Sequence, residues 1–237
     1  MITTVVFDLD DTLYDEIEYC KSGFAAVGEF LANQSESRSS LMGEGEAPPA
    51  KRIYAVLWEQ FTAGNRTKTF NAALNELGIS YDDELIGELI EIYRNHSPKI
   101  SLPQDSRDVL CELSTKYTLA LLTDGFLPAQ QLKVRALGIE KYFKYTVYTE
   151  QLGRECWKPS PAGFEKIVQS LNVEPAHMVY VADNEEKDFI APNRLGFATV
   201  ELVRPARVHT SVVTESGAAA QHIIHQIRQL PALLKRL

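Results

Sequence analysis

The sequence predicts an α/β protein with a doubly wound parallel sheet and an inserted helical domain. Short apolar runs alternate with helical patterns over residues 98–237, which is the arrangement of βαβ units. A similar apolar run at the N-terminus is separated from them by a long segment with helical patterns only. We therefore expect a core domain of residues 1–15 and 98–237, and a helical domain of residues 16–97.

Five segments have the composition of strands that are buried on both faces. Residues 2–8 form a β-branched run that ends in turn residues, and four similar runs follow, at residues 118–124, 145–150, 177–183 and 197–203. Helical patterns lie between them, at residues 106–117, 128–137, 161–171 and 185–195. In such a sheet ligands bind beyond the carboxyl ends of the strands, where Asp8, Thr123 and Asp183 lie.

The segment before residue 98 contains helical patterns at residues 16–33, 50–62, 68–77 and 82–95. Residues 34–50 are rich in Ser, Gly, Glu and Pro, a composition typical of a mobile loop. We expect Trp58, Phe61 and Phe70 to pack in the core of this helical domain. Near the C-terminus, His222 and His225 are interpreted as sharing one face of a solvated amphipathic helix, not as a metal-binding pair.

Composition narrows the classes of function. The 24 Lys and Arg against 32 Asp and Glu give a net charge of −8, which argues against nucleic-acid and membrane-surface partners. Three widely spaced cysteines form no Cys-x-x-Cys pair, so we expect reduced thiols. The N-terminus lacks a signal-peptide pattern and no apolar run reaches bilayer length, which predicts a cytoplasmic protein. Nothing in the sequence indicates an oligomeric state.

The N-terminal strand ends in a cluster of carboxylates. Asp8 and Asp10 lie two residues apart, so their side chains project to the same side of the chain, whereas Asp11 is interpreted as a turn or capping residue. Asp183 ends another predicted strand, and Asp188 follows five residues later. Mg²⁺ binds one or two protein carboxylates together with water and substrate phosphate. The pattern therefore predicts a Mg²⁺ site that accepts a phosphate group.

Four segments, in this order along the chain, resemble the motifs of the haloacid dehalogenase-like hydrolase superfamily. They are DLDDT at residues 8–12, LLTDG with Thr123, CWKPSPAGF with Lys158, and VADNEEKDF with Asp183 and Asp188. The insertion resembles the helical cap of this family. The resemblance implies a Mg²⁺-dependent phosphatase that hydrolyses a small phosphomonoester through an aspartyl-phosphate intermediate.

The resemblance also implies roles for the acidic residues. Asp8 would be the nucleophile, and Asp10 the general acid and then the general base. The side chains of Asp8 and Asp183 and the backbone carbonyl of Asp10 would hold Mg²⁺. Asp188 would orient Lys158 or a metal-bound water, which places all four acidic residues around the metal.

The phosphate group would be bound by the second and third motifs. Thr123 would donate its hydroxyl to a phosphoryl oxygen, next to Asp124 and Gly125, and Lys158 would neutralise charge on the nucleophile and on the transferring group. The second motif reads Thr-Asp-Gly where Thr-Asn-Gly is commoner, and the fourth reads Ala-Asp-Asn where Gly-Asp-Asn is usual. A carboxylate at Asp124 repels phosphate unless its side chain turns away.

Other activities remain alternatives. Haloacid dehalogenation does not use an acid two residues after the nucleophile, so Asp10 argues against it. Phosphomutases of the family often carry Val where this chain has Thr12, and a phosphonate hydrolase would need a lysine from the cap. A signalling module phosphorylated on aspartate is disfavoured by the large insertion and by Asp10. Candidate cap residues for substrate contact are Arg38, Arg52, Arg66 and Lys68.

Overall fold

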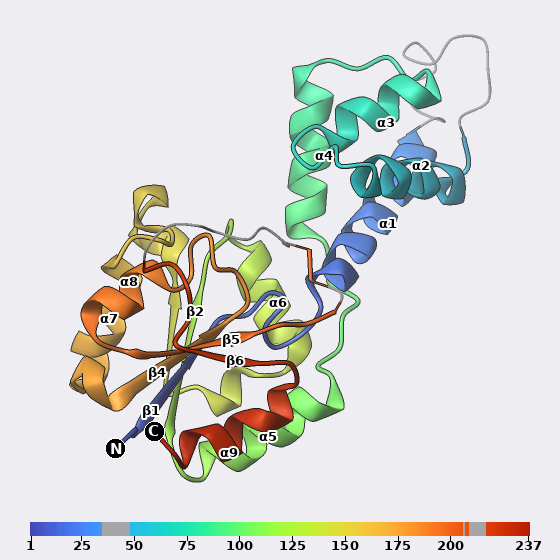
Figure 1. Ribbon diagram of the computed structural model, residues 1–237. Helices are drawn as coiled ribbons and strands as arrows, with labels where there is room; N and C mark the ends of the chain where they lie inside the picture. The colour runs from blue at the N-terminus through green and yellow to red at the C-terminus, as the bar shows by residue number, and fades with distance from the viewer. Residues whose placement is uncertain (35–47, 206, 209–216) are drawn as a thin grey trace. The chain divides into compact units, whose positions relative to one another are not determined.

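The computed structural model describes residues 1–34, 48–205, 207–208 and 217–237 (Figure 1). The chain divides into two compact units, residues 1–17 with 100–237, and residues 18–99. Most of the loop expected at residues 34–50, including Arg38, lies outside the described residues. No helix in the described ranges is long and apolar enough to cross a membrane.

The first unit contains a six-stranded sheet in the order β3-β2-β1-β4-β5-β6, with every neighbouring pair parallel. Chain order reverses at β1, which has β2 on one side and β4 on the other, so the predicted doubly wound α/β class is confirmed. The strands are β1 (Thr4–Phe7), β2 (Thr118–Thr123), β3 (Tyr145–Tyr148), β4 (Met178–Ala182), β5 (Ala198–Leu202) and β6 (His222–Ile224).

Helices cover both faces of this sheet. Val5, Val6 and Phe7 are consecutive and all 0% exposed, which requires cover on each side of β1. On one face, Phe164 and Ile167 of α7 belong to the same core cluster as Val6 and Tyr180. The helices of this unit, some of which Figure 1 labels, are α5 (Gln104–Ser114), α6 (Ala129–Leu137), α7 (Ala162–Leu171), α8 (Ile190–Leu195) and α9 (Leu230–Leu234).

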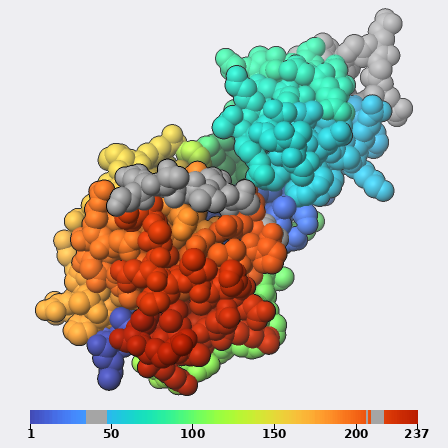
Figure 2. All heavy atoms as spheres, in the orientation of Figure 1, coloured from blue at the N-terminus to red at the C-terminus, as the bar shows by residue number. Residues whose placement is uncertain are grey.

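The prediction of a helix carrying His222 and His225 is wrong. His222 begins β6, which pairs in parallel with β5 at the edge of the sheet, and His225 follows the strand. Ile224 is buried there, so the three-residue strand gains apolar burial and backbone pairing that a solvated helix would lack. In the orientation of Figure 2, β5, β6 and the described residues after β6 form much of the visible surface of this unit.

The second unit is helical, as the sequence predicts. It contains α1 (Glu16–Gln34), whose first two residues belong to the α/β unit, with α2 (Ala50–Thr62), α3 (Thr69–Leu77) and α4 (Asp83–Asn95). Aromatic rings fill its core: Phe24 makes edge contacts with Phe61 at 5.4 Å and with Phe70 at 6.3 Å between ring centroids. Phe61 is buried and Trp58 packs against it, which supports the expectation that these rings are core residues.

Candidate active site

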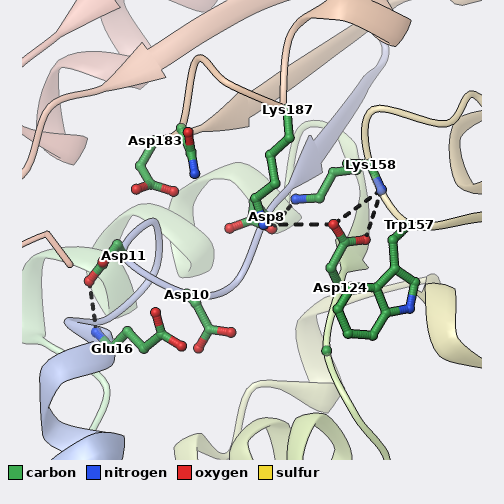
Figure 3. A pocket seen from close by; sticks show the side chains of 11 residues that line it. Asp8, Asp10, Asp11, Glu16, Asp124, Trp157, Lys158, Asp183 and Lys187 are labelled. Atoms are coloured by element: carbon green, nitrogen blue, oxygen red, sulfur yellow. Dashed lines mark hydrogen bonds and ion pairs between the residues drawn. The ribbon is translucent and has the colours of Figure 1, made fainter. Parts of the chain in front are cut away.

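A pocket opens at the carboxyl ends of β1, β2 and β4, within the α/β unit (Figure 3). Six carboxylates and two lysines line it, so its walls are strongly acidic and will repel a phosphate unless a cation is present. The lining residues are Asp8, Asp10, Asp11, Glu16, Asp124, Gly125, Trp157, Lys158, Asp183, Asn184 and Lys187.

Asp8 is held rigidly at the base of this pocket. Its backbone N–H donates to the carbonyl of Val181 at 2.9 Å, which continues the β1–β4 pairing past the end of the strand. Its Oδ1 lies 2.6 Å from the Nζ of Lys158, and its Oδ2 accepts from the hydroxyl of Thr12 at 3.3 Å. Burial raises the pKa of Asp8 to about 7, although the charge of Lys158 opposes this shift.

Lys158 is fully enclosed by polar partners. Three oxygens lie within 3.0 Å of its Nζ, from Asp8 at 2.6 Å, Asp188 at 2.6 Å and Tyr180 at 3.0 Å. Burial by itself lowers the pKa of Lys158, but the charges of Asp188 and Asp8 outweigh it and raise the pKa well above its usual value. The lysine is therefore a permanent cation beside the carboxylate of Asp8.

Asp188 lies behind the pocket and does not line it. Its Oδ1 contacts Lys158, and its Oδ2 accepts from the backbone N–H of Asn184 at 3.0 Å. Residues 184–188 form a turn that wraps this carboxylate, so α8 begins only at Ile190, and the predicted helix of residues 185–195 is wrong over its first turn. Of the two expected roles, the contact with Lys158 is the one seen in this geometry.

Asp10 is bound by side chains that the sequence interpretation missed. Lys133 lies 2.9 Å from both carboxylate oxygens, Tyr14 donates to Oδ1 at 2.6 Å, and Gln130 donates to Oδ2 at 2.8 Å. Burial favours a higher pKa for Asp10, but the charge of Lys133 and these hydrogen bonds outweigh burial and lower it. Asp10 is therefore ionised at neutral pH, which is the form that accepts a proton. The only sequence signal for Gln130 and Lys133 was their three-residue spacing on a helix after the second motif.

The second motif does not present Thr123 to the pocket, where the sequence predicts a contact with the phosphate group. Thr123 is 1% exposed, its hydroxyl accepts from Gln130 at 2.6 Å, and it does not line the pocket. Asp124 accepts hydrogen bonds from the hydroxyl of Thr149 at 2.7 Å and from the backbone N–H of Lys158 at 3.1 Å, so it connects the second motif to the third.

Gly125 has a backbone conformation that requires glycine. Its φ is +133°, and a Cβ there would lie 2.8 Å from the side chain of Gln130.

Asp11 is a turn residue, which confirms its interpretation. Its φ of +54° lies in the left-handed region that Asp tolerates, and its carboxylate accepts from the backbone N–H groups of Glu16 and Val208. These bonds turn the chain from β1 into α1 and fix the backbone of the preceding residues. Burial raises the pKa of Asp11 to about 6.

The donor set fits Mg²⁺. Among the described residues, the buried Oδ2 of Asp183 finds no hydrogen-bond partner, which is costly for a polar atom unless a ligand satisfies it. Burial, with the charges of Asp188 and Asp8, raises the pKa of Asp183 to about 9. The described residues hold no preformed group of three or more His, Cys, Asp or Glu ligands. Mg²⁺ does not require one, since it uses one or two carboxylates with other oxygens and water.

We expect the metal-free protein to lose stability as pH rises from 6 to 9. The pKa values of Asp8 and Asp183, about 7 and about 9, lie above those of an unfolded aspartate, so the folded state binds more protons in this window. The free energy of unfolding then falls as pH increases. Melting temperatures measured in chelator from pH 6 to pH 9 should decrease, and Asp183→Asn should flatten the slope. A melting temperature that rises over this range contradicts the expectation.

Comparison with known proteins identifies the family to which this chain belongs and several similar proteins. The model of the haloacid dehalogenase-like hydrolase family matches residues 2–196. Glyceraldehyde 3-phosphate phosphatase of Methanopyrus kandleri is 28% identical, with 86% of this chain and 85% of that protein covered. N-acylneuraminate-9-phosphatase of Mus musculus is 25% identical, with 100% and 95% covered. The crystal structure of 2-haloacid dehalogenase from Pseudomonas syringae pv. tomato has the same fold, with a TM-score of 0.65, 24% identity, and 100% and 99% of the two chains covered.

Proposed function

Because the chain belongs to the haloacid dehalogenase-like hydrolase family, we propose that it is a Mg²⁺-dependent phosphatase acting on a small phosphomonoester through an aspartyl-phosphate intermediate. One observation carries the proposal: the carboxylate of Asp8 lies in the pocket with one oxygen on Lys158, and the same pocket is lined by Asp183, whose buried Oδ2 has no hydrogen-bond partner in the described part of the chain. The names of two relatives, phosphatases for glyceraldehyde 3-phosphate and for N-acylneuraminate 9-phosphate, support a phosphomonoester substrate.

In the first half of the reaction an oxygen of Asp8 attacks phosphorus, and the bond from phosphorus to the leaving oxygen breaks. Lys158 and the hydroxyl of Thr12 contact Asp8 and fix the direction of its carboxylate. The leaving oxygen takes a proton from Asp10. Because the free site holds Asp10 ionised, Asp10 has to take up this proton when the substrate binds. Phosphoryl transfer depends mainly on positioning and charge stabilisation, which this arrangement provides.

In the second half a water molecule attacks the phosphorus of the aspartyl phosphate. Asp10 takes a proton from this water, and the bond between phosphorus and Asp8 breaks, which releases inorganic phosphate and the free carboxylate. The lowered pKa of Asp10, caused by Lys133 and the hydrogen bonds from Tyr14 and Gln130 against the effect of burial, suits this base role.

The carboxylates of Asp8 and Asp183 and the backbone carbonyl of Asp10 would hold Mg²⁺. When bound, the ion supplies positive charge that offsets the acidic walls and stabilises the charge on the transferring phosphoryl group. The carboxylate of Asp188 acts indirectly, because it holds Lys158 in place. We further propose that the enzyme acts in the cytoplasm on a small phosphorylated molecule, without nucleic-acid or membrane partners, which its net charge of −8 supports.

Hydrolysis of an aryl phosphate is expected to require Mg²⁺. Six carboxylates line the pocket against two lysines, so a phosphate dianion meets net repulsion without the ion. Initial rates are measured in excess chelator and again after Mg²⁺ is restored above the chelator concentration. Activity should be lost in the first condition and regained in the second. Full turnover in excess chelator would exclude the proposed mechanism.

A further inference from the structure

We propose that Trp157 forms a subsite for the leaving group of the substrate, and that this subsite favours phosphomonoesters whose leaving group carries a flat, apolar ring. This assignment rests on the phosphatase function proposed above and names a class of substrate for it. The phosphoryl group is common to every phosphomonoester, so discrimination between substrates must come from contacts with the rest of the molecule. Trp157 lines the pocket and directly precedes Lys158 in the chain.

Trp157 is the single large apolar side chain among the described residues that line the pocket. The other lining residues are six acidic residues, two lysines, Asn184 and Gly125. Those charged groups suit a metal ion and a phosphoryl group, but they offer nothing to carbon atoms. Ligand sites bind the apolar part of a ligand through aromatic and aliphatic walls. The indole is therefore the part of this wall that suits the carbon skeleton of a leaving group.

The polar group of the indole is already used within the protein. The Nε1–H of Trp157 donates to the Oε2 of Glu150 at 3.1 Å, and a tryptophan side chain has no other hydrogen-bond donor. The side chain is only partly buried, so ring surface remains accessible. Trp157 thus offers a ligand apolar contact and stacking, and it does not offer a hydrogen bond to a phosphoryl oxygen.

The indole ring is held in place from several sides. Phe126 makes an edge contact with it, with 5.4 Å between the ring centroids and an interplanar angle of 72°. The guanidinium of Arg154 lies 4.5 Å from the ring centroid of Phe126, and its Nε lies 3.6 Å from Glu150. The next backbone N–H, of Lys158, is bonded to Asp124. A ring that is already fixed loses little conformational entropy when a ligand contacts it.

The indole also lies on a suitable side of the pocket. Figure 3 shows it beside Asp124, on the side away from Asp183, which is the proposed metal ligand. In the proposed reaction Asp10 protonates the leaving oxygen, and Asp10 lines the same pocket as the indole. A ring bonded at this oxygen is therefore the part of the substrate that contacts Trp157.

Kinetics with two esters test the subsite. Benzyl phosphate and ethyl phosphate both have primary alcohols as leaving groups, and only the first carries a ring. The value of kcat/KM at saturating Mg²⁺ is measured with each ester for the wild type, Trp157→Ala, Trp157→Leu and Trp157→Phe. The reactivity of each ester cancels when a variant is divided by the wild type. Trp157→Ala should lower kcat/KM about 10- to 100-fold more for benzyl phosphate than for ethyl phosphate, the size of a lost stacking contact.

The other variants separate a ring contact from a structural role. Trp157→Phe keeps a flat ring and should lower the ratio of the two esters less than Trp157→Leu does. Tyr117→Leu is the matched control, because Tyr117 is a part-exposed aromatic residue directly before β2, at the opposite end of that strand from the pocket. It should leave the ratio unchanged. If Trp157→Ala does not fold, Trp157→Leu and Trp157→Phe decide. A fall of both esters by one common factor in the folded variants would overturn the subsite.

Binding without turnover gives a second measurement. Titration calorimetry at saturating Mg²⁺ compares benzylphosphonate with ethylphosphonate, in which a carbon atom replaces the leaving oxygen. The wild type should bind benzylphosphonate more tightly, and Trp157→Ala should remove most of this difference. Equal affinities in the wild type would overturn the subsite while leaving the phosphatase proposal intact. A wild-type protein that binds neither phosphonate and hydrolyses neither ester overturns both.

Discussion

Replacing Asp8 with asparagine is expected to reduce phosphatase activity on the order of 10⁴-fold or more, as loss of a covalent nucleophile does in other enzymes. The amide has nearly the shape of the carboxylate, and its oxygen can still accept from Lys158, but it does not form an acyl phosphate. The measurement is kcat for an aryl phosphate at saturating Mg²⁺, with acid-quench labelling to show that the variant forms no phosphoenzyme.

The fold should survive this substitution, which separates chemistry from stability. Lys158 keeps Asp188 and Tyr180 as partners, and burial already disfavours a charged Asp8, as its pKa of about 7 shows. The melting temperature of Asp8→Asn should therefore stay close to that of the wild type. Asp15→Asn, at a part-exposed carboxylate beside Arg204, is the matched control and should retain activity. If a folded Asp8→Asn enzyme keeps wild-type kcat, Asp8 is not the nucleophile.

The sequence predicts the part of the site that depends on topology. In a doubly wound sheet the carboxyl ends of β1, β2 and β4 meet at one edge, so residues that end these strands share a region whatever their side-chain conformations. Asp8, Asp10, Asp124 and Asp183 line one pocket for this reason. The helical patterns of the insertion were also predictable, because each is long enough to show its period.

The remaining features depend on contacts that no local pattern encodes. Gln130 and Lys133 can be identified as partners of Asp10 only when α6 places them against it. Lys187 follows four acidic or amide residues, and no pattern in the sequence indicates that it lines the pocket. β6 spans three residues, too few to show the alternation of a strand, and its pairing with β5 decides its conformation.

The second large effect is expected at Asp10, where Asp10→Asn should slow turnover of an aryl phosphate about 10²- to 10⁴-fold, the usual contribution of general acid–base catalysis. Aryl phosphates have good leaving groups, so the first half of the reaction needs little help from an acid. The second half needs a base for water, and an amide cannot accept that proton. The variant should release one equivalent of phenolate rapidly and then accumulate phosphoenzyme, which a rapid-quench time course detects.

The environment of Asp10 requires one further variant. Asp10→Asn removes the carboxylate that lies 2.9 Å from the ammonium of Lys133 and leaves Glu16, at 3.6 Å, among the described residues near it. A displaced lysine would then lower activity in the same way as a missing base. In the double variant Asp10→Asn/Lys133→Met this charge is absent. If Asp10 is the base, the double variant still shows the burst and the slow second phase. If turnover recovers to the wild-type rate, the defect came from Lys133 and the base must be sought elsewhere in the pocket.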